Sequence, residues 1–388
     1  MKRAHLSIFF IFFFIQSNAT VVSVRILTTK VITSFIFSPI EGSYSIYGDE
    51  MFLTDCDASS IFQMSIEGDS IQLKTFEKTV GKYGSIKMIS KESECAFKIK
   101  SVLSESKVRT YEDNLFVSVS ADKKQFLLIN KVDVEKYIAG VVESESGKKS
   151  SLEYYKLQSI LCRTYLLAHI SRHVLEGFEV CDDVHCQAYL NRTSNLEIKK
   201  AVYATKGLVV VDNDLNIITA AFFSNCGGET CNSQDVWSIP TSYLKSVKDS
   251  FCLHQPHAHW KREIPLEDWK SYLQLKHKYP EEDSLKLNSA TSFAQENGRA
   301  IYFIDKDLQI PLKTIRADFQ LKSTYFSITQ IGNTIVFNGR GYGHGVGLCQ
   351  EGAMRMADLK YSYKDILNFY YRDVHLVDLS ALNYFRQE

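Results

Sequence analysis

The sequence predicts an α+β protein with a β-rich N-terminal domain and a mixed α/β core that contains one long helix. Three observations predict this fold class. Residues 21–133 alternate short apolar and polar runs with a period of two, which is typical of strands. Residues 150–177 change to helical spacing, and strand-like runs return at 207–211 and 217–223. The length of 388 residues is enough for two or three domains.

The first nineteen residues have the pattern of a signal peptide. Lys2 and Arg3 precede an apolar segment at residues 6–15, and Ser17 and Ala19 are small residues before a cleavage site. The apolar segment is too short to span a bilayer comfortably. We therefore expect residues 1–19 to be removed and the chain to be exported to the periplasm or cell envelope. Membrane attachment is expected only if this segment is retained.

The N-terminal β-rich domain is predicted to span residues 20–115. Its strand-like runs are rich in β-branched and aromatic residues and are separated by turn signals such as the Gly48–Asp49 pair. Strands are expected at residues 22–27, 43–47, 70–73, 115–119 and 125–130.

The core is predicted to span residues 116–380. Its long helix begins at a capping box formed by Ser150 and Glu153, continues through Val174 and ends near Gly177. Further strands are expected at residues 301–304 and 325–328, and two short helices near the C-terminus, the second capped by Ser362. Residues 254–282 are polar, carry Trp260 and Trp269, and are interpreted as a helical insertion.

Charge and cysteine content limit the function classes. Lys and Arg together number 45, as do Asp and Glu, and no basic run favours nucleic acid as a partner. Nine cysteines leave at least one unpaired or bound to metal in an oxidising compartment. Cys56 could pair with Cys95, and Cys226 could pair with either Cys231 or Cys252. Spacing alone does not define which cysteines form disulfides.

Five glycines occupy alternate positions from Gly339 to Gly347. In an extended segment this pattern removes the side chains from one face, where a rigid ligand could approach the peptide groups. Arg340, Tyr342 and His344 project from the intervening positions. The alternative interpretation is a glycine-rich packing turn.

Glu145 precedes the long helix and is a candidate for acid–base chemistry, because partial burial would raise the pKa of its carboxyl group toward neutrality. Gln158 and Arg163 are polar residues among apolar neighbours on that helix. Arg163 keeps its charge and therefore needs a partner or a polar cleft. The alternative is that Glu145 is a helix N-terminal carboxylate and that Arg163 belongs to a structural ion pair.

Three blocks of residues, in this order along the chain, resemble the stage II sporulation protein D family. The blocks are residues 137–145 with 156–158 and 163–165; residues 223–230 with 236–237 and 243–247; and residues 339–353 with 363–371. Together they extend over residues 117–371. One block would be weak support, whereas three in the family's order are highly specific.

The resemblance implies a lytic transglycosylase that cuts the β-1,4 bond between N-acetylmuramic acid and N-acetylglucosamine in peptidoglycan glycan strands, preferring strands without stem peptides. The family's catalytic residue falls on Glu145, which would act first as acid and then as base and leave 1,6-anhydro ends. The glycan-binding cleft would lie between the long helix and the glycine run, and no cofactor is required for the chemistry. Candidate substrate-binding residues are Gln158, Arg163, Tyr165, Ser224, Arg340, Tyr342, His344 and Gln350.

A metal-ligand set follows the long helix. Two thiols and two imidazoles lie close together at His173, Cys181, His185 and Cys186, which suits a structural Zn²⁺ ion. Some members of the family hold zinc at this segment. His169 is an alternative ligand, and a disulfide between Cys181 and Cys186 is the competing interpretation.

Two other functions remain as alternatives. Some relatives are described as amidase enhancers, so a non-catalytic peptidoglycan-binding partner of a cell-wall amidase is the first. A zinc hydrolase that uses the Cys181–Cys186 set is the second. A Cys349–His344 nucleophile is disfavoured, because sequence proximity does not supply the geometry that such a pair requires.

Overall fold

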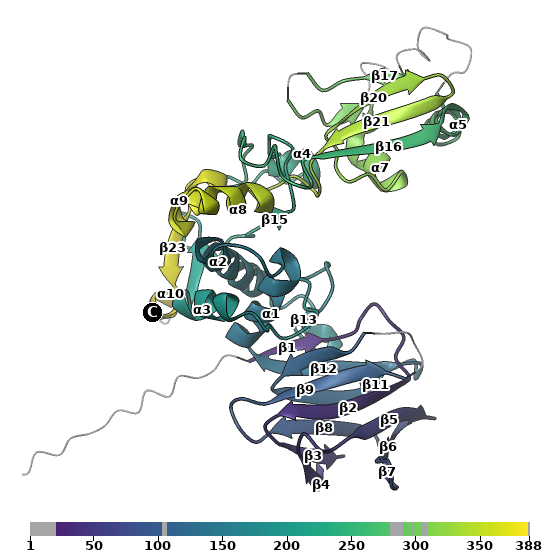
Figure 1. Ribbon diagram of the computed structural model, residues 1–388, viewed down its shortest axis with the longest axis vertical. Helices are drawn as coiled ribbons and strands as arrows, with labels where there is room; N and C mark the ends of the chain where they lie inside the picture. Colours follow the sequence, from purple (N-terminus) through teal and green to yellow (C-terminus); the bar gives the residue numbers. More distant parts are fainter. Residues whose placement is uncertain (1–20, 103–106, 280–289, 297, 304–308, 387–388) are drawn as a thin grey trace, which may run out of the picture.

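The computed structural model describes residues 21–102, 107–279, 290–296, 298–303 and 309–386, with side chains described as far as residue 382. The expected signal peptide at residues 1–19 lies outside the described residues. Within the described residues, no helix combines the length and the apolar character that a membrane span needs. The α+β fold class is confirmed, with strands dominating the N-terminal part (Figure 1).

Two sheets, antiparallel except for the parallel pair β1–β13, pack face to face in the N-terminal part. One has seven strands in the order β13-β1-β12-β11-β8-β3-β4, and the other has six in the order β10-β9-β2-β5-β6-β7. The bounds are β1 Val21–Arg25, β2 Ser34–Glu41, β3 Tyr44–Gly48, β4 Met51–Cys56, β5 Phe62–Glu67, β6 Ser70–Lys74, β7 Thr79–Tyr83, β8 Ser85–Ser90, β9 Ala96–Ser101, β10 Arg109–Glu112, β11 Asn114–Val119, β12 Phe126–Asp133 and β13 Val180–Cys181.

Aromatic side chains fill the space between these sheets. The Phe35 and Phe126 rings meet edge to face with centroids 5.2 Å apart, and Phe37 and Tyr44 do the same at 5.8 Å. Each pair joins one strand of each sheet. The alternating burial of β12 explains how its sequence forms a strand with one face in this core. The seven-stranded sheet takes β12 and β13 from beyond residue 115, so it includes strands from both parts of the chain.

Three helices follow β12 and pack against one another. They are α1 Val134–Ser146, α2 Leu152–His169 and α3 Leu196–Ala204. The side chain of Asp133 caps α1 by accepting hydrogen bonds from the backbone N–H groups of Glu135 and Lys136. The predicted capping box is wrong by one residue, because Ser151 caps α2 through the N–H of Tyr154. The helix also ends at His169, and Gly177 instead ends the separate 3₁₀ turn η1 Val174–Glu176.

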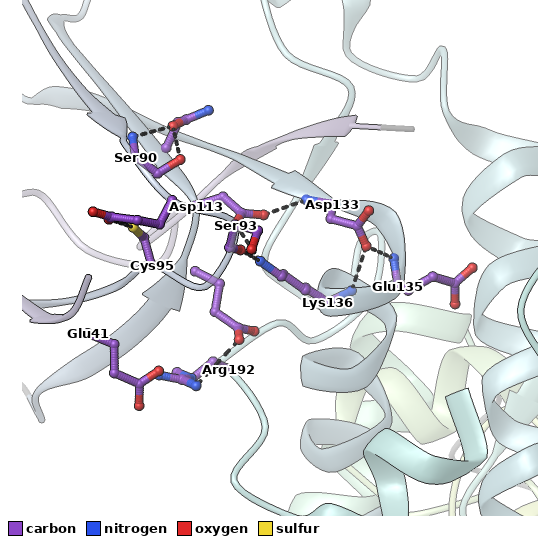
Figure 2. Close-up of polar contacts among 12 residues, drawn as sticks. Glu41, Ser90, Ser93, Cys95, Asp113, Asp133, Glu135, Lys136 and Arg192 are labelled. Atoms are coloured by element: carbon purple, nitrogen blue, oxygen red, sulfur yellow. Dashed lines mark hydrogen bonds and ion pairs between the residues drawn. The ribbon is translucent and has the colours of Figure 1, made fainter. Parts of the chain in front are cut away.

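Polar contacts attach the start of α1 to the N-terminal sheets (Figure 2). Lys136 Nζ lies 2.7 Å from the Asp113 carboxylate, and both side chains are largely buried. Arg192 pairs with Glu41 at 2.7 Å. The Lys136–Asp113 pair fixes α1 at its N-terminal end and thereby orients its C-terminal end, where Glu145 lies, whereas the Arg192–Glu41 pair ties the segment after β13 to β2.

The glycine run is brought beside the segment that contains Phe223. β15 Phe222–Phe223 pairs in parallel with β22 Leu348–Cys349, and β14 Leu208–Val211 pairs with β23 His375–Asp378. Of the strand expected at residues 217–223, only the last two residues form one. The remaining helices here are α4 Ser233–Trp237, α8 Gln350–Asp358, α9 Tyr363–Tyr370 and α10 Leu379–Arg386.

A small lobe at the end of the molecule opposite the N-terminal sheets has its own apolar core around Trp269 (Figure 1). It contains β16 His259–Pro265, α5 Leu266–His277, β17 Ser292–Phe293, β18 Tyr302–Phe303, β19 Ile310–Pro311, α7 Leu312–Asp318, β20 Phe326–Ile331 and β21 Thr334–Arg340. The expected helical insertion at 254–282 is therefore only partly helical. β16 forms because it pairs along its whole length with β21, a contact that the local polar sequence does not reveal.

Candidate functional site

A cavity of about 1060 Å³ lies between α1, α2 and the segments around Phe223 and His344. Six residues that the sequence predicted to act on or bind the substrate line this cavity. They are Glu145, Tyr165, Ser224, Tyr342, His344 and Gln350. His185 and Cys186 of the predicted metal set also line its wall.

Glu145 lies in the last turn of α1, not at the start of the long helix as the sequence suggested. The N-terminal dipole interpretation is therefore wrong, and the C-terminal end of a helix disfavours a negative charge. Burial raises the pKa of Glu145 above its usual 4.5, and a hydrogen bond from the Ala188 N–H at 2.8 Å opposes that effect. Glu145 is the only carboxylate among the described residues that line the cavity. A single carboxyl group, whose pKa burial raises, therefore lines the open space.

The glycine run does not present a bare face to a ligand. Gly341, Gly343 and Gly347 adopt φ of 77°, 119° and 81°, so the segment is not an extended strand. A Cβ atom on Gly347 would lie 2.1 Å from the Ala221 carbonyl oxygen, and one on Gly341 would lie 2.5 Å from that of Asn225. The glycines thus allow close packing on the chain's own backbone, and the part of the run that lines the cavity is Tyr342, Gly343 and His344.

His344 is held as a neutral imidazole. Its Nδ1 accepts the Val346 N–H at 3.1 Å, so its Nε2 carries the proton and donates to the Phe222 carbonyl at 3.1 Å. Burial lowers the pKa of His344 to about 4. The ring lies 5.3 Å from that of Trp237, centroid to centroid, and forms part of an aromatic wall. At neutral pH His344 can contact a ligand but cannot act as a general acid.

Ser224 lies beside a histidine and a glutamate without forming a nucleophilic triad. Its Oγ is 3.0 Å from His257 Nδ1, and Glu351 Oε1 is 2.8 Å from the same nitrogen. A triad uses the two different ring nitrogens, one for the hydroxyl and one for the carboxylate. The arrangement therefore holds Ser224 in place at the cavity edge.

Three predicted substrate-binding residues lie away from the cavity. Arg163 is fully buried and forms an ion pair with Glu135, with Nε 3.0 Å from Oε1. Gln158 is fully buried and accepts a hydrogen bond from the Tyr154 hydroxyl at 3.2 Å. The Arg340 guanidinium lies 3.9 Å from the centre of the Tyr325 ring. The structural alternative for Arg163 thus describes it correctly, and none of the three contacts the cavity.

Sequence reasoning missed several cavity residues. Arg172, Gln187, Trp237 and Arg316 line it, and Gln187 is almost completely buried beside the Ala188 N–H that holds Glu145. Trp237 stands inside a block that resembles the family, and this aromatic residue could have been chosen as a sugar-stacking candidate. The other three carry no local pattern that separates them from ordinary surface residues.

The predicted metal set does come together in space. The ligand atoms of His173, Cys181, His185 and Cys186 all lie within 4.8 Å of one another. His173 Nδ1 pairs with Glu176, while its buried Nε2 has no hydrogen-bond partner among the described residues. A carboxylate on the outer nitrogen is the usual support for a metal-binding imidazole.

The charge of this set also fits a cation. The hydrogen bond with Cys181 lowers the pKa of the Cys186 thiol to about 6, so a thiolate is accessible near neutral pH. His169, the alternative ligand, meets the Tyr165 ring edge to face instead, with ring centroids 4.3 Å apart. The donor set of two sulfurs and two nitrogens therefore suits Zn²⁺.

Comparison with known proteins gives a consistent result. Residues 122–211 match the family model described as stage II sporulation protein, a range that contains Glu145 and the predicted metal set. The chain is 30% identical over 284 residues to the amidase enhancer of Bacillus subtilis, covering 60% of this chain and 39% of that protein. It is 27% identical to stage II sporulation protein D of Bacillus amyloliquefaciens over 68% of this chain and 80% of that protein. An uncharacterised protein of Brachyspira hyodysenteriae is 28% identical over 66% of this chain and 70% of its own length. The chain is thus similar to members of the stage II sporulation protein D family, and its residues 122–211 match the family model.

Proposed function

We propose that the chain is an exported lytic transglycosylase of the periplasm or cell envelope. Its substrate would be the β-1,4 bond between N-acetylmuramic acid and N-acetylglucosamine in peptidoglycan, preferably in strands without stem peptides. One observation carries the proposal: a single carboxyl group, Glu145, faces a large cavity and has a raised pKa. The resemblance to the family assigns the catalytic role to the same residue.

Glu145 alone can perform both proton transfers. In its neutral form it donates a proton to the glycosidic oxygen as the C1–O bond breaks and positive charge develops at the sugar ring. The resulting carboxylate then removes the proton from the C6 hydroxyl of that sugar, whose oxygen attacks C1 and closes a 1,6-anhydro ring. The proton is returned to Glu145, so the enzyme is regenerated. The Ala188 N–H, 2.8 Å from Oε1, stabilises the carboxylate stage between the two transfers.

The other cavity residues suit glycan binding. Tyr342 and Trp237 expose about two fifths of their surface and offer rings for the apolar faces of sugars. Gln350 is oriented by its side-chain N–H, which lies 3.4 Å from the Glu145 carbonyl oxygen. Ser224, Tyr165 and His344 complete a polar and aromatic lining.

We also propose that His173, Cys181, His185 and Cys186 hold a structural Zn²⁺ ion. The unpartnered His173 Nε2 and the convergence of four donor atoms support this assignment. When bound, the ion would cross-link the loop that follows β13 to the end of the helical segment. That loop leads to Ala188, so the ion would keep the Ala188 N–H directed at Glu145 without taking part in proton transfer.

The test compares Glu145→Gln with the wild-type chain on purified glycan strands that lack stem peptides. We expect 1,6-anhydro ends from the wild type by mass spectrometry, and a rate lower by roughly 10²–10⁴-fold in the variant. Glu143→Gln is the matched control. Glu143 is two residues away on α1, but it faces Thr193 and Ser194 instead of the cavity. Anhydro products from Glu145→Gln at the wild-type rate would contradict the proposed role.

A second candidate function is a non-catalytic enhancer of a cell-wall amidase. The 30% identity to a protein named amidase enhancer favours it, and an aromatic cavity could bind glycan without cutting it. In that case wild type and Glu145→Gln would both bind glycan strands, neither would produce anhydro ends, and both would stimulate an added amidase. Product analysis by mass spectrometry therefore separates the two functions.

A further inference from the structure

A second cluster of metal-binding side chains lies behind the cavity, apart from the His173 set. The ligand atoms of Cys226, Asp249, Cys252 and Cys349 all lie within 4.8 Å of one another, and all four residues are fully buried. Cys226 follows β15, Cys349 ends β22 and caps α8, and the other two residues lie in the loop after α4. Residues from three separate segments of the chain thus converge on one point in the core.

The sulfur atoms in this cluster are surrounded by backbone donors. Cys349 Sγ accepts the N–H of Cys226 at 3.2 Å and that of Gly352 at 3.4 Å, at the N-terminal end of α8. The backbone N–H groups of Gly227 and Gly228 are likewise directed at Cys252. Backbone N–H groups directed at sulfur stabilise the thiolate, the form that binds metal.

In the part of the chain that the structure describes, no cationic side chain pairs with Asp249. Its Oδ2 accepts the Tyr370 hydroxyl at 2.9 Å and lies 3.2 Å from Cys226 Sγ, and its Oδ1 accepts the Phe251 N–H at 2.9 Å. A buried carboxylate among potential thiolates is unfavourable unless a positive charge is present. A divalent cation at the centre of the four groups supplies that charge.

A disulfide explains less of this arrangement. Cys226 Sγ and Cys252 Sγ lie 3.3 Å apart, so this pair is the one that could oxidise. Oxidation would use two of the three sulfurs and would leave Cys349 as a separate buried thiol, with the Asp249 carboxyl group beside it still without a cation. A tetrahedral zinc ion with Zn–S bonds of about 2.3 Å places its sulfur ligands about 3.8 Å apart and uses all four groups.

We propose that Cys226, Asp249, Cys252 and Cys349 form a second structural site for a thiophilic divalent cation of the Zn²⁺ class. Binding releases the protons of the three thiols and of the carboxyl group to solvent. Three thiolates and one carboxylate around Zn²⁺ carry the same formal charge as the common four-cysteine site. The backbone N–H donors and the start of α8 offset that charge.

This site would join the two segments that form one side of the cavity. Ser224 precedes Cys226 by two residues, and Gln350 directly follows Cys349, and both line the cavity. Asn225 Nδ2 also donates to Glu351 at 2.6 Å, so the two segments are already in contact. Loss of the ion would therefore loosen the cavity wall that contains Ser224 and Gln350.

The test isolates the second site with the double variant Cys181→Ser, Cys186→Ser, purified as the full chain under reducing conditions. After loading with Zn²⁺ or Co²⁺, we expect one ion per chain by elemental analysis, and a cobalt spectrum with thiolate charge-transfer bands. Adding Cys349→Ser should weaken these bands and lower the affinity for the ion. Adding Cys162→Ser, a buried cysteine of α2 outside both clusters, should change neither.

A second measurement needs no substitution at the site. Wild-type chain loaded with Zn²⁺ is treated with a thiol-alkylating reagent, with and without a chelator, and the labelled peptides are identified by mass spectrometry. We expect Cys226, Cys252 and Cys349 to become labelled together when the chelator is added. Absence of metal from the Cys181/Cys186 double variant, together with a Cys226–Cys252 linked peptide in the unreduced protein, would overturn the proposal.

Discussion

At the scale of single residues, the position of a polar group in the fold determines its role more than its neighbours in the sequence do. Arg163 and Glu145 were both candidates for the cleft, yet only Glu145 faces it. The difference is that Glu135, 28 residues before Arg163, reaches the guanidinium and forms a buried ion pair. No local pattern reveals such a partner. The sequence could identify Glu145 because it lies in a family-specific block, but its helix was assigned incorrectly.

The buried ion pair has a measurable consequence. Arg163→Met should lower the free energy of unfolding by about 3–5 kcal/mol, because Glu135 then remains buried without a counter-charge. The double variant Glu135→Gln, Arg163→Met should recover much of that loss. Urea denaturation measures both. Lys200→Met breaks the exposed pair with Glu197 and serves as a control with an expected effect of about 0–1 kcal/mol. Equal losses at the two positions would contradict this account.

His344 gives a pH-dependent prediction. Its pKa falls from an ordinary 6.5 to about 4 in the folded chain, so the unfolded chain binds a proton at this position first as pH falls. The stability contributed by neutral His344 is thus fully present above pH 6.5 and is lost as pH falls toward 4. Relative to His344→Asn, the wild type should lose on the order of 2 kcal/mol over this window in urea denaturation.

The control for this prediction is His259→Asn, which alters an exposed histidine of the lobe. Its stability should follow that of the wild type across the same pH range. If His344→Asn also loses stability in parallel with the wild type, then the imidazole is not the group that responds to acid.

At the scale of elements, the glycine run shows how a correct observation can support the wrong geometry. Alternate glycines predicted an extended face open to a ligand, but four of them adopt left-handed φ values and the run packs on residues 221–227. The two arrangements share one requirement, the absence of side chains, so the sequence alone could not separate them. The strand β16 was missed for a related reason, since its partner β21 lies more than 65 residues later.

The glycine run can be tested by a matched pair of substitutions. Gly347→Ala places a Cβ 2.1 Å from the Ala221 carbonyl oxygen in addition to the left-handed backbone, so it should lower the unfolding free energy by more than about 2 kcal/mol. Gly332→Ala has a similar φ of 58° but no atom within 4 Å of the new Cβ, and should cost only about 1 kcal/mol. Similar losses in calorimetry would show that backbone strain alone matters.

At the scale of the whole molecule, the chain has a main apolar core and a separate one in the lobe between β16 and β21. The fold class followed from sequence periodicity, because strand and helix periods depend on local burial. The arrangement of these parts did not, because it depends on pairings between distant segments.

Because the lobe has its own apolar core, a substitution that damages this core should unfold the lobe and leave the rest of the molecule folded. Trp269 is fully buried and contacts Phe303, Phe319 and Phe337, so Trp269→Ala removes the centre of that core. Hydrogen exchange should accelerate in β16, α5 and β21, while α1 and α2 keep their protection. Faster exchange throughout α1 and α2 would mean that the two cores unfold as one unit. Tyr272→Ala, at the partly buried edge of the same cluster, should have a smaller effect.

The position of β1 between β13 and β12 has a consequence for how the chain folds as it is made. Val21 pairs with Asp133, and Val24 also pairs with Val180, so both neighbours of this strand come from far along the chain. When the N-terminus emerges first, at roughly 5–20 residues per second, β1 waits on the order of ten seconds for either neighbour. During that time its unpaired edges are open to strands of other chains. Correct assembly of the sheet therefore depends on protecting the first strand until the later ones arrive.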